Sequence, residues 1–296
     1  MRIVMAGSSG FLGTALADRL HADGHEVVRL VRRPARGAGE VTWDPEARHL
    51  DAAVLAGADG VVNLSGASIN HVWTEVYRKI LVTSRVNPTA TIAAAITALN
   101  PTERPKVLVN GSAVGFYGDT GNLPVDEDAT SGGDFLADLC RVWEGATRPV
   151  DDAGVRVVRL RTGFPLHRSG GFLAAVLPAF RMGLGPRLGS GRQWLPWISL
   201  EDWLSVVTFV LSREDVAGPV NAVGPAPVPN AEFTRDLATA VHRPAFVRIP
   251  GPPVRLFLGD LGRTMLASSR VRPGALNRHE FTFRHQTLPA ALEAAL

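Results

Sequence analysis

The feature that most constrains this chain is a glycine triplet near its start, in which Gly7, Gly10 and Gly13 stand three residues apart. The run from Arg2 to Ala6 before it has the composition of a buried β-strand, and leucines recur after it at helical spacing. A strand that turns through glycines into a helix leaves free N–H groups and the positive end of the helix dipole facing the turn. Such a turn suits a dinucleotide pyrophosphate. The alternative, a plain strand–helix turn, is less favoured because both the strand and the helix are present.

The end of the second expected strand bears on which nicotinamide cofactor would fit. This strand covers Glu26 to Val31, and Arg32 and Arg33 follow it. An acidic residue here would hydrogen-bond a free ribose 2′-hydroxyl and repel a phosphate. The planar forks of two arginines instead bind a 2′-phosphate and stack on adenine. NADP(H) is therefore favoured over NAD(H), and the alternative is an arginine pair that contacts only solvent.

Strands and helices alternate over the first 165 residues. We expect further strands over 41–44, 60–64, 106–110 and 155–160, and helices over 11–23, 72–99 (kinked at Pro88) and 135–151. This order predicts an α/β fold with a Rossmann-type doubly wound parallel sheet. Ser65 and Gly66 follow the strand over 60–64, where small residues let a ligand lie across the sheet edge; the alternative is an ordinary turn.

The amino-acid composition of the chain changes at about Pro165. Residues 166–198 are rich in glycine, proline and aromatic residues, and we expect loops that wall a ligand site. A helix over 200–211 and a strand over 219–223 follow, and then helices near 231–241, 254–267 and 287–296. The predicted division is an NADP(H)-binding domain of residues 1–165, to which 199–224 return. Residues 166–198 and 225–296 would form a smaller C-terminal α/β lobe.

Composition narrows the class of protein. Of the 296 residues, 46% are hydrophobic and 20% charged, which is typical of a globular protein, and no apolar run is long enough to predict a membrane span. The single cysteine, Cys140, excludes an internal disulfide and fits the cytoplasm. The net charge is only +3 and the basic residues are scattered, so no nucleic-acid partner is expected. The eight histidines form no metal motif, and we predict no metal.

Several motifs together resemble a known family. Those that resemble the extended short-chain dehydrogenase/reductase (SDR) superfamily are the glycine triplet, Arg32, Asn63 to Gly66, and Ser112 to Gly118. Others narrow the resemblance to its atypical "epimerase family", or NAD-dependent epimerase/dehydratase, branch: Asp134 to Ala137, Trp143-Glu144, Gly189 to Gln193, Pro196 to Ile198, and Asp202. The tail from Ser269 to Leu292 resembles the C-terminal domain of unknown function, DUF1731, that members of this branch carry. The resemblance covers essentially the whole chain.

The resemblance implies a set of cofactor contacts. Arg32 would contact the 2′-phosphate, Leu64 and Ser65 would lie near adenine and ribose, and Arg85 would be a further contact. The residues implied for the pyrophosphate region are Gly7, Ser9, Gly10, Phe11, Leu12 and Gly13.

The chain departs from the superfamily where catalysis normally takes place. Superfamily reductases use a Tyr-x-x-x-Lys pair, in which the lysine lowers the tyrosine pKa so that the phenol can transfer a proton. No such pair exists here, and Leu136 and Cys140 align with its two positions, while Arg85 replaces the usual helix asparagine. The usual proton relay is therefore absent, as is typical of the branch.

Two functions follow as hypotheses. The first is an NADP(H)-dependent oxidoreductase or epimerase of a small carbonyl- or hydroxyl-bearing substrate, in which Ser112 holds a substrate oxygen and Tyr117 supplies a proton. Arg192 and Trp194 would line the substrate pocket. Ser112, Tyr117 and Trp194 each have a purely structural alternative, as a strand-end hydrogen bonder or as core packing. The second hypothesis is a non-catalytic NADP(H)-binding redox sensor or interaction protein. The oligomeric state stays open.

Overall fold

Seven parallel strands form the central sheet, in the order β12-β7-β5-β4-β1-β2-β3. The computed structural model describes residues 1–296, apart from the side chain of Leu258. The strands are β1 (Arg2–Ala6), β2 (Glu26–Val31), β3 (Glu40–Thr42), β4 (Gly60–Asn63), β5 (Val107–Ala113), β7 (Arg156–Thr162) and β12 (Gly218–Ala222). Strand order reverses between β1 and β4, which confirms the predicted doubly wound sheet.

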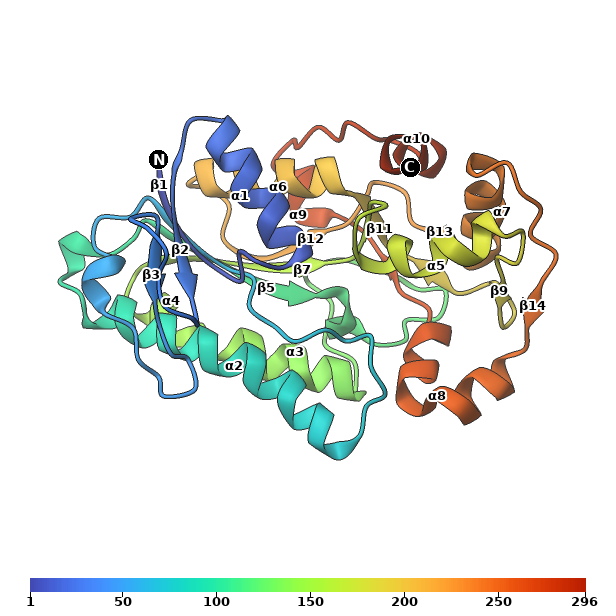
Figure 1. The fold of residues 1–296 in the computed structure, drawn as a ribbon, viewed down its shortest axis with the longest axis horizontal. Helices are drawn as coiled ribbons and strands as arrows, with labels where there is room; N and C mark the ends of the chain where they lie inside the picture. The colour runs from blue at the N-terminus through green and yellow to red at the C-terminus, as the bar shows by residue number, and fades with distance from the viewer.

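Helices cover both faces of this sheet (Figure 1). The helices α1 (Phe11–Ala22) and α6 (Leu200–Ser212) lie on one face, and α2 (Glu75–Ala98) packs on the other. Because successive strand residues point to opposite faces, β1 contributes Ile3 and Met5 to the core beneath α1 and α6, and Val4 and Ala6 to the core against α2. The chain continues helically through Pro88 in α2.

The helix expected over 135–151 is two helices, so that prediction was wrong in its extent. The structure has α3 (Phe135–Gly145) and α4 (Arg148–Asp152). Pro149 has no N–H to continue the helical ladder. The hydroxyl of Thr147 donates to the carbonyl of Glu144 (2.7 Å), which turns the chain between the two helices.

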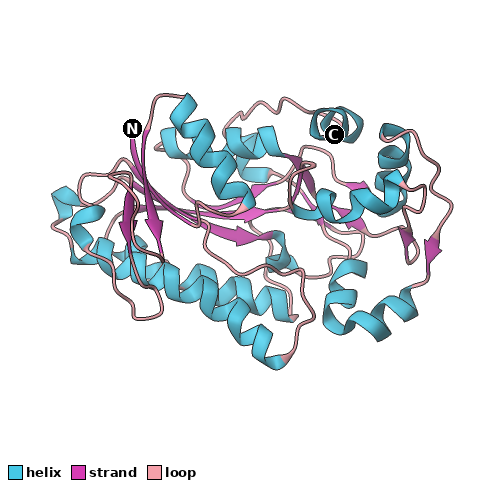
Figure 2. Cartoon of the chain, viewed as in Figure 1, coloured by secondary structure: helices cyan, strands magenta, loops and turns pink.

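The C-terminal lobe lies beyond the carboxyl edge of the sheet (Figure 2). Residues 166–198 are not all loop as expected, because they contain the helix α5 (Gly171–Arg181). The glycine- and proline-rich composition hides the helical spacing of Leu173, Leu177 and Phe180, which pack in the core of the lobe. That core also includes α7 (Asn230–Ala240) and α10 (Leu288–Ala295), close to two of the expected helices.

Short helices and strands complete the fold. The remaining helices are α8 (Gly251–Leu266) and α9 (Gly274–Arg278), with single 3-10 turns at η1 (Ala52–Val54), η2 (Pro101–Glu103) and η3 (Val114–Tyr117). Four two-stranded sheets pair β6 (Pro124–Val125) with β15 (Arg270–Val271), β8 (Phe164–Leu166) with β11 (Trp197–Ser199), β9 (Arg187–Leu188) with β14 (Arg248–Ile249), and β10 (Trp194–Leu195) with β13 (Val228–Pro229). Among the described residues, no helix is long and apolar enough to cross a membrane.

Candidate functional site

Three glycines shape a cradle at the carboxyl end of β1. Gly7 has a φ of +79°, and a Cβ atom on it would lie 2.5 Å from the carbonyl carbon of Leu64 in the loop after β4. A Cβ atom on Gly13 would lie 2.1 Å from the carbonyl oxygen of Gly7. A Cβ atom on Gly10 would make only an ordinary contact, 3.6 Å from the carbonyl oxygen of Gly7, and this residue is exposed. Gly7 and Gly13 are therefore required by the close approach of backbone segments, and Gly10 leaves room for a ligand.

The N-terminus of α1 opens into this cradle with free donors. Gly10 caps the helix without a side-chain hydrogen bond, and the N–H groups of the first turn have no intrahelical partner. Ser9 and Gly10 are exposed. Free N–H groups and a helix dipole at an open glycine turn form an anion site, so the residues fit the pyrophosphate of a dinucleotide.

The two arginines after β2 differ in their surroundings. Arg33 forms a bidentate ion pair with Glu40, with both N–O distances at 2.7 Å. The hydrogen bond from Arg33 holds the pKa of Glu40 at about 2. Arg32 is exposed and its side chain has no partner within the described part of the chain. The predicted contact with a 2′-phosphate is therefore open to Arg32, whereas Arg33 is already engaged.

Arg85, in α2, holds the loop after β4 by a hydrogen bond. Its guanidinium donates to the carbonyl oxygens of Ala67 (3.0 Å) and Leu81 (3.1 Å), and burial lowers its pKa. A Cβ atom on Gly66 would lie 3.0 Å from its Cζ atom. Arg85 thus fixes the loop that carries Ser65, and its direct contact with a cofactor stays a prediction.

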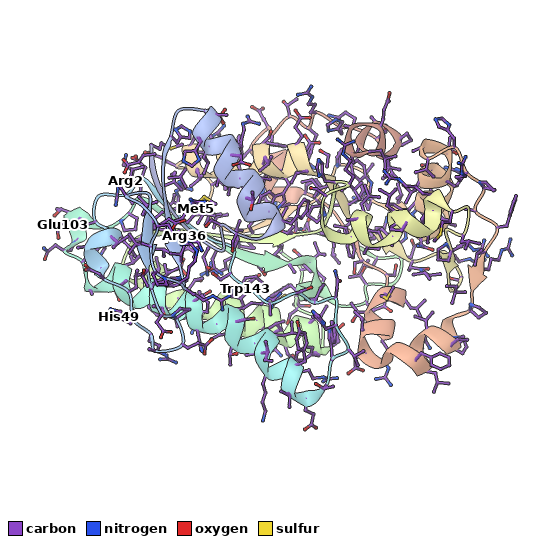
Figure 3. The ribbon with its side chains drawn as sticks, viewed as in Figure 1. Arg2, Met5, Arg36, His49, Glu103 and Trp143 are labelled. Carbon is purple, nitrogen blue, oxygen red and sulfur yellow. The ribbon has the colours of Figure 1, made fainter. Side chains whose placement is uncertain are left out.

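A buried amide network underlies the same sheet edge. The side-chain amide of Asn63 donates to Thr89 (2.9 Å) and to Asn110 (2.8 Å), while its oxygen accepts from the backbone N–H of Ser65. The indole of Trp143 donates to Thr89 (3.1 Å), and Figure 3 shows Trp143 between α3 and the sheet. This network orients the loop after β4 and involves two residues, Thr89 and Asn110, that sequence reasoning did not select.

Ser112 belongs to a second buried network, which we call the Glu144 cluster (Ser112, Tyr117, Glu144, Arg161 and Asn221). Ser112 donates to Glu144 (2.6 Å), and Glu144 pairs with Arg161 at 2.9 and 3.0 Å. Their side chains are only 9% and 5% exposed. The hydrogen bonds and charge of Glu144 outweigh the cost of burial and raise the pKa of Arg161. The cluster thus contains a fully paired buried ion pair.

Tyr117 occupies the other end of this cluster. Its hydroxyl donates to Asn221 (2.7 Å) and accepts from Arg161 (2.9 Å). Burial raises the pKa of this phenol to about 12. Tyr117 is therefore protonated and engaged at neutral pH, which disfavours the predicted role as proton donor.

The positions of the usual Tyr and Lys hold no replacement acid or base. Leu136 packs against Gly115, and a Cβ atom added to Gly115 would lie 3.2 Å from the Cβ atom of Leu136. Cys140 is buried with its thiol 3.7 Å from the carbonyl of Ala113, and burial raises its pKa to about 12. Neither side chain exchanges protons near neutral pH.

The acidic run at 126–128 contains a structural residue. Glu127 is buried and accepts hydrogen bonds from the backbone N–H groups of Asn221 (2.8 Å) and Ala275 (2.9 Å). Burial raises its pKa. Glu127 therefore ties β12 to α9.

The two residues predicted to line a substrate pocket lie in the C-terminal lobe. Arg192 is exposed. Trp194 donates from its indole to Asn122 (2.8 Å), and the guanidinium of Arg270 lies 4.4 Å from its ring. Trp194 thus joins three segments, and its contact with a substrate stays a prediction. No cluster of three or more His, Cys, Asp or Glu side chains that could hold a metal ion occurs among the described residues.

Glu144 and Arg161 are two further residues to which the sequence analysis assigned no role in the site. Their available signal was a charge at an otherwise buried position: Glu144 follows Trp143 on the inner face of α3, and Arg161 lies in β7 after buried valines and a leucine. A buried charge needs a partner, but the sequence does not say which one.

Comparison with known proteins places these features in a family. Residues 3–138 match the NAD dependent epimerase/dehydratase family, and residues 249–295 match a domain of unknown function, DUF1731. The chain is 43% identical to an epimerase family protein of Mycobacterium bovis, over 98% of this chain and 96% of that protein. It is 36% identical to human epimerase family protein SDR39U1, over 99% of both chains.

A solved structure extends this similarity to three dimensions. The crystal structure of the human protein SDR39U1 (isoform 2) with NADPH superposes with a TM-score of 0.91 at 35% identity, over 100% of this chain and 99% of that one. The short C-terminal helices and strands of this chain are included in that match.

Proposed function

Because this chain belongs to the NAD-dependent epimerase/dehydratase family, we propose that it binds NADP(H) in the glycine cradle and acts as an oxidoreductase or epimerase on a small carbonyl- or hydroxyl-bearing substrate. The observation that carries the proposal is the uncapped N-terminus of α1 at the exposed Gly10, which follows β1. The exposed Arg32 follows β2, the parallel neighbour of β1. The NADPH in the structure of the similar human protein supports the choice of cofactor.

The cofactor, when bound, supplies or accepts the hydride. The N–H groups at the start of α1 would bind the pyrophosphate, and Arg32 would pair with the 2′-phosphate. Arg85 and the amide network would hold Leu64 and Ser65 in place beside the nucleotide. The hydroxyl of Ser112 already donates a hydrogen bond to Glu144. Its oxygen lone pairs would therefore accept a hydrogen bond from a substrate hydroxyl.

A second function, a non-catalytic NADP(H)-binding redox sensor or interaction protein, is favoured by one observation. Leu136 and Cys140 replace the usual proton relay, and Tyr117 is held in hydrogen bonds with a pKa of about 12. Among the described residues, the hydroxyl groups of Ser112 and Tyr117 thus already donate hydrogen bonds within the protein.

Deuterium-labelled NADPH separates the two functions. The protein would be mixed with this cofactor and a bacterial metabolite extract, and every metabolite analysed for label by mass spectrometry. Label in one compound would establish hydride transfer and name the substrate class. Tight NADPH binding without label, and without reduction of bound NADP⁺ by the extract, would favour the sensor. Absence of NADPH binding would contradict both.

Two arginine variants test whether Arg32 contacts the 2′-phosphate of NADPH. Arg32→Ala should weaken NADPH far more than NADH, whereas Arg255→Ala, at an exposed arginine of α8, should change neither. Equal weakening of both cofactors by Arg32→Ala would contradict the 2′-phosphate assignment.

A further inference from the structure

The C-terminal lobe contains a cavity of about 520 Å³ that is remote in sequence from the glycine cradle. It lies between α7, β9 and β14, at the end of the molecule away from the N-terminus (Figure 1). Its volume falls within the range of small-molecule pockets, about 300–1,000 Å³. Size alone therefore permits a ligand.

The cavity has an unbalanced charge. Its lining includes four arginines and one histidine, namely Arg187, Arg235, Arg243, Arg248 and His242. No acidic side chain is among the described residues that line it. A concave surface with one sign of charge concentrates ligands of the other sign. The cavity therefore favours an anion.

Two of these arginines are engaged elsewhere and two are not. Arg235 pairs with Asp236 (2.9 Å) on the same helix, and Arg243 donates to backbone carbonyl oxygens. In the part of the chain that the structure describes, the guanidinium groups of Arg187 and Arg248 have neither a hydrogen bond nor an ion pair. These two groups are free to bind a ligand.

Two unpartnered polar atoms in the same lining point to a ligand independently of charge. The hydroxyl of Thr234 and the Nε atom of Arg187 are buried without a hydrogen-bond partner, and among the described residues they are the two such side-chain atoms. Thr234 is only 4% exposed. Native proteins pair nearly all buried polar groups. Both groups can donate, so acceptor oxygens of a ligand would satisfy them.

We propose that this cavity binds a small organic molecule through a phosphate group. A phosphate offers three acceptor oxygens and nearly two negative charges, which match two arginines and one hydroxyl. Apolar side chains of the lining, Ala231, Ala238 and Val247, would contact the carbon skeleton. The site is separate from the glycine cradle and does not depend on the proposed cofactor function.

Isothermal titration calorimetry with inorganic pyrophosphate tests the proposal. The protein would first be saturated with NADPH, so that the glycine cradle is filled. We expect one pyrophosphate site per chain, weakened about tenfold or more by Arg248→Gln and abolished by Arg187→Gln with Arg248→Gln. Arg255→Gln, at an exposed arginine outside the cavity, should leave the affinity unchanged.

Thr234→Val distinguishes a binding role from a structural one. Because the hydroxyl has no partner, this near-isosteric change should keep or raise the thermal unfolding temperature while it weakens pyrophosphate binding several-fold. The proposal is overturned if pyrophosphate does not bind, or if it binds equally well to the double arginine variant.

The cradle itself needs a parallel control. Gly13→Ala, which disturbs the turn at the start of α1, should retain pyrophosphate binding at the cavity even if NADPH binding is lost. Pyrophosphate binding that disappears in Gly13→Ala but persists in the double cavity variant would assign it to the cradle and contradict this inference.

Discussion

The glycine cradle and the Glu144 cluster lie at the carboxyl edge of the same sheet, and they treat their polar groups in opposite ways. At the cradle, the first N–H groups of α1 have no side-chain cap, and Gly10 at the helix start is exposed. In the Glu144 cluster, Ser112 and Arg161 both donate to Glu144 within a buried network. One region keeps its donors free, and the other pairs them internally.

This difference teaches which part of the site is ready for a ligand. Free donors at a helix N-terminus bind an anion without first breaking protein contacts. A buried and satisfied ion pair stabilises one arrangement and resists proton exchange. The glycine cradle is therefore open to a ligand, while the polar groups of the Glu144 cluster are engaged with one another.

The largest expected effect comes from breaking the Glu144 cluster. Arg161→Met leaves the carboxylate of Glu144 buried without its partner, which should lower the free energy of unfolding by about 3–5 kcal/mol. Urea denaturation followed by circular dichroism measures this. The double variant Arg161→Met with Glu144→Gln should recover part of the loss. A loss below about 1 kcal/mol would mean that the pair is hydrated like a surface salt bridge.

The next effect tests the cradle. Gly13→Ala places a Cβ atom 2.1 Å from the carbonyl of Gly7, so the turn must shift and NADPH affinity should fall about 100-fold, or about 2.7 kcal/mol. Calorimetric titration measures the affinity. Gly145→Ala is the matched control, because nothing lies within 4 Å of its Cβ position. Unchanged NADPH affinity in Gly13→Ala would show that the cradle is not the cofactor site.

A smaller effect separates the two arginines after β2. Arg32→Ala should weaken NADPH about tenfold through the loss of one charge-assisted contact and should leave NADH nearly unchanged. Arg33→Ala removes the bidentate pair with Glu40 instead, so its effect on NADPH should be smaller. The reverse ranking, measured by competitive titration, would mean that Arg33 leaves Glu40 when the cofactor binds.

The smallest effect concerns Tyr117. Tyr117→Phe should cost about 1 kcal/mol of stability, because Arg161 and Asn221 each lose one hydrogen bond, and NADPH affinity should not change. The raised pKa of about 12 means that the folded protein holds the phenolic proton more tightly than the unfolded chain. Wild-type stability should therefore fall as pH rises from about 10 to 12, and less steeply in Tyr117→Phe. Identical pH profiles of stability in the two proteins would contradict the raised pKa of Tyr117. Loss of hydride transfer in Tyr117→Phe at unchanged stability would instead indicate that Tyr117 is a catalytic residue.

Much of the fold could be predicted because its signals are local. The strands β1, β2 and β4 follow short apolar runs, and Gly24, with a positive φ, follows the end of α1 close to the expected boundary. The split between α3 and α4 and the helix α5 were missed. A proline and a glycine-rich composition obscured the periodicity there, and tertiary packing decided the outcome.

The sequence by itself determined the glycine turn, because the positive φ of Gly7 and the close approach of Gly13 to the Gly7 carbonyl are local to the turn and only glycine permits them. It also determined the alternation of strands and helices. Only the tertiary structure decided which charges are paired. Arg33 pairs with Glu40 and Arg161 pairs with Glu144, whereas the buried Nε atom of Arg187 has no partner among the described residues. The physical reason is range: hydrophobic periodicity and backbone clearance act over a few residues, whereas a buried charge finds its partner only when distant segments pack together.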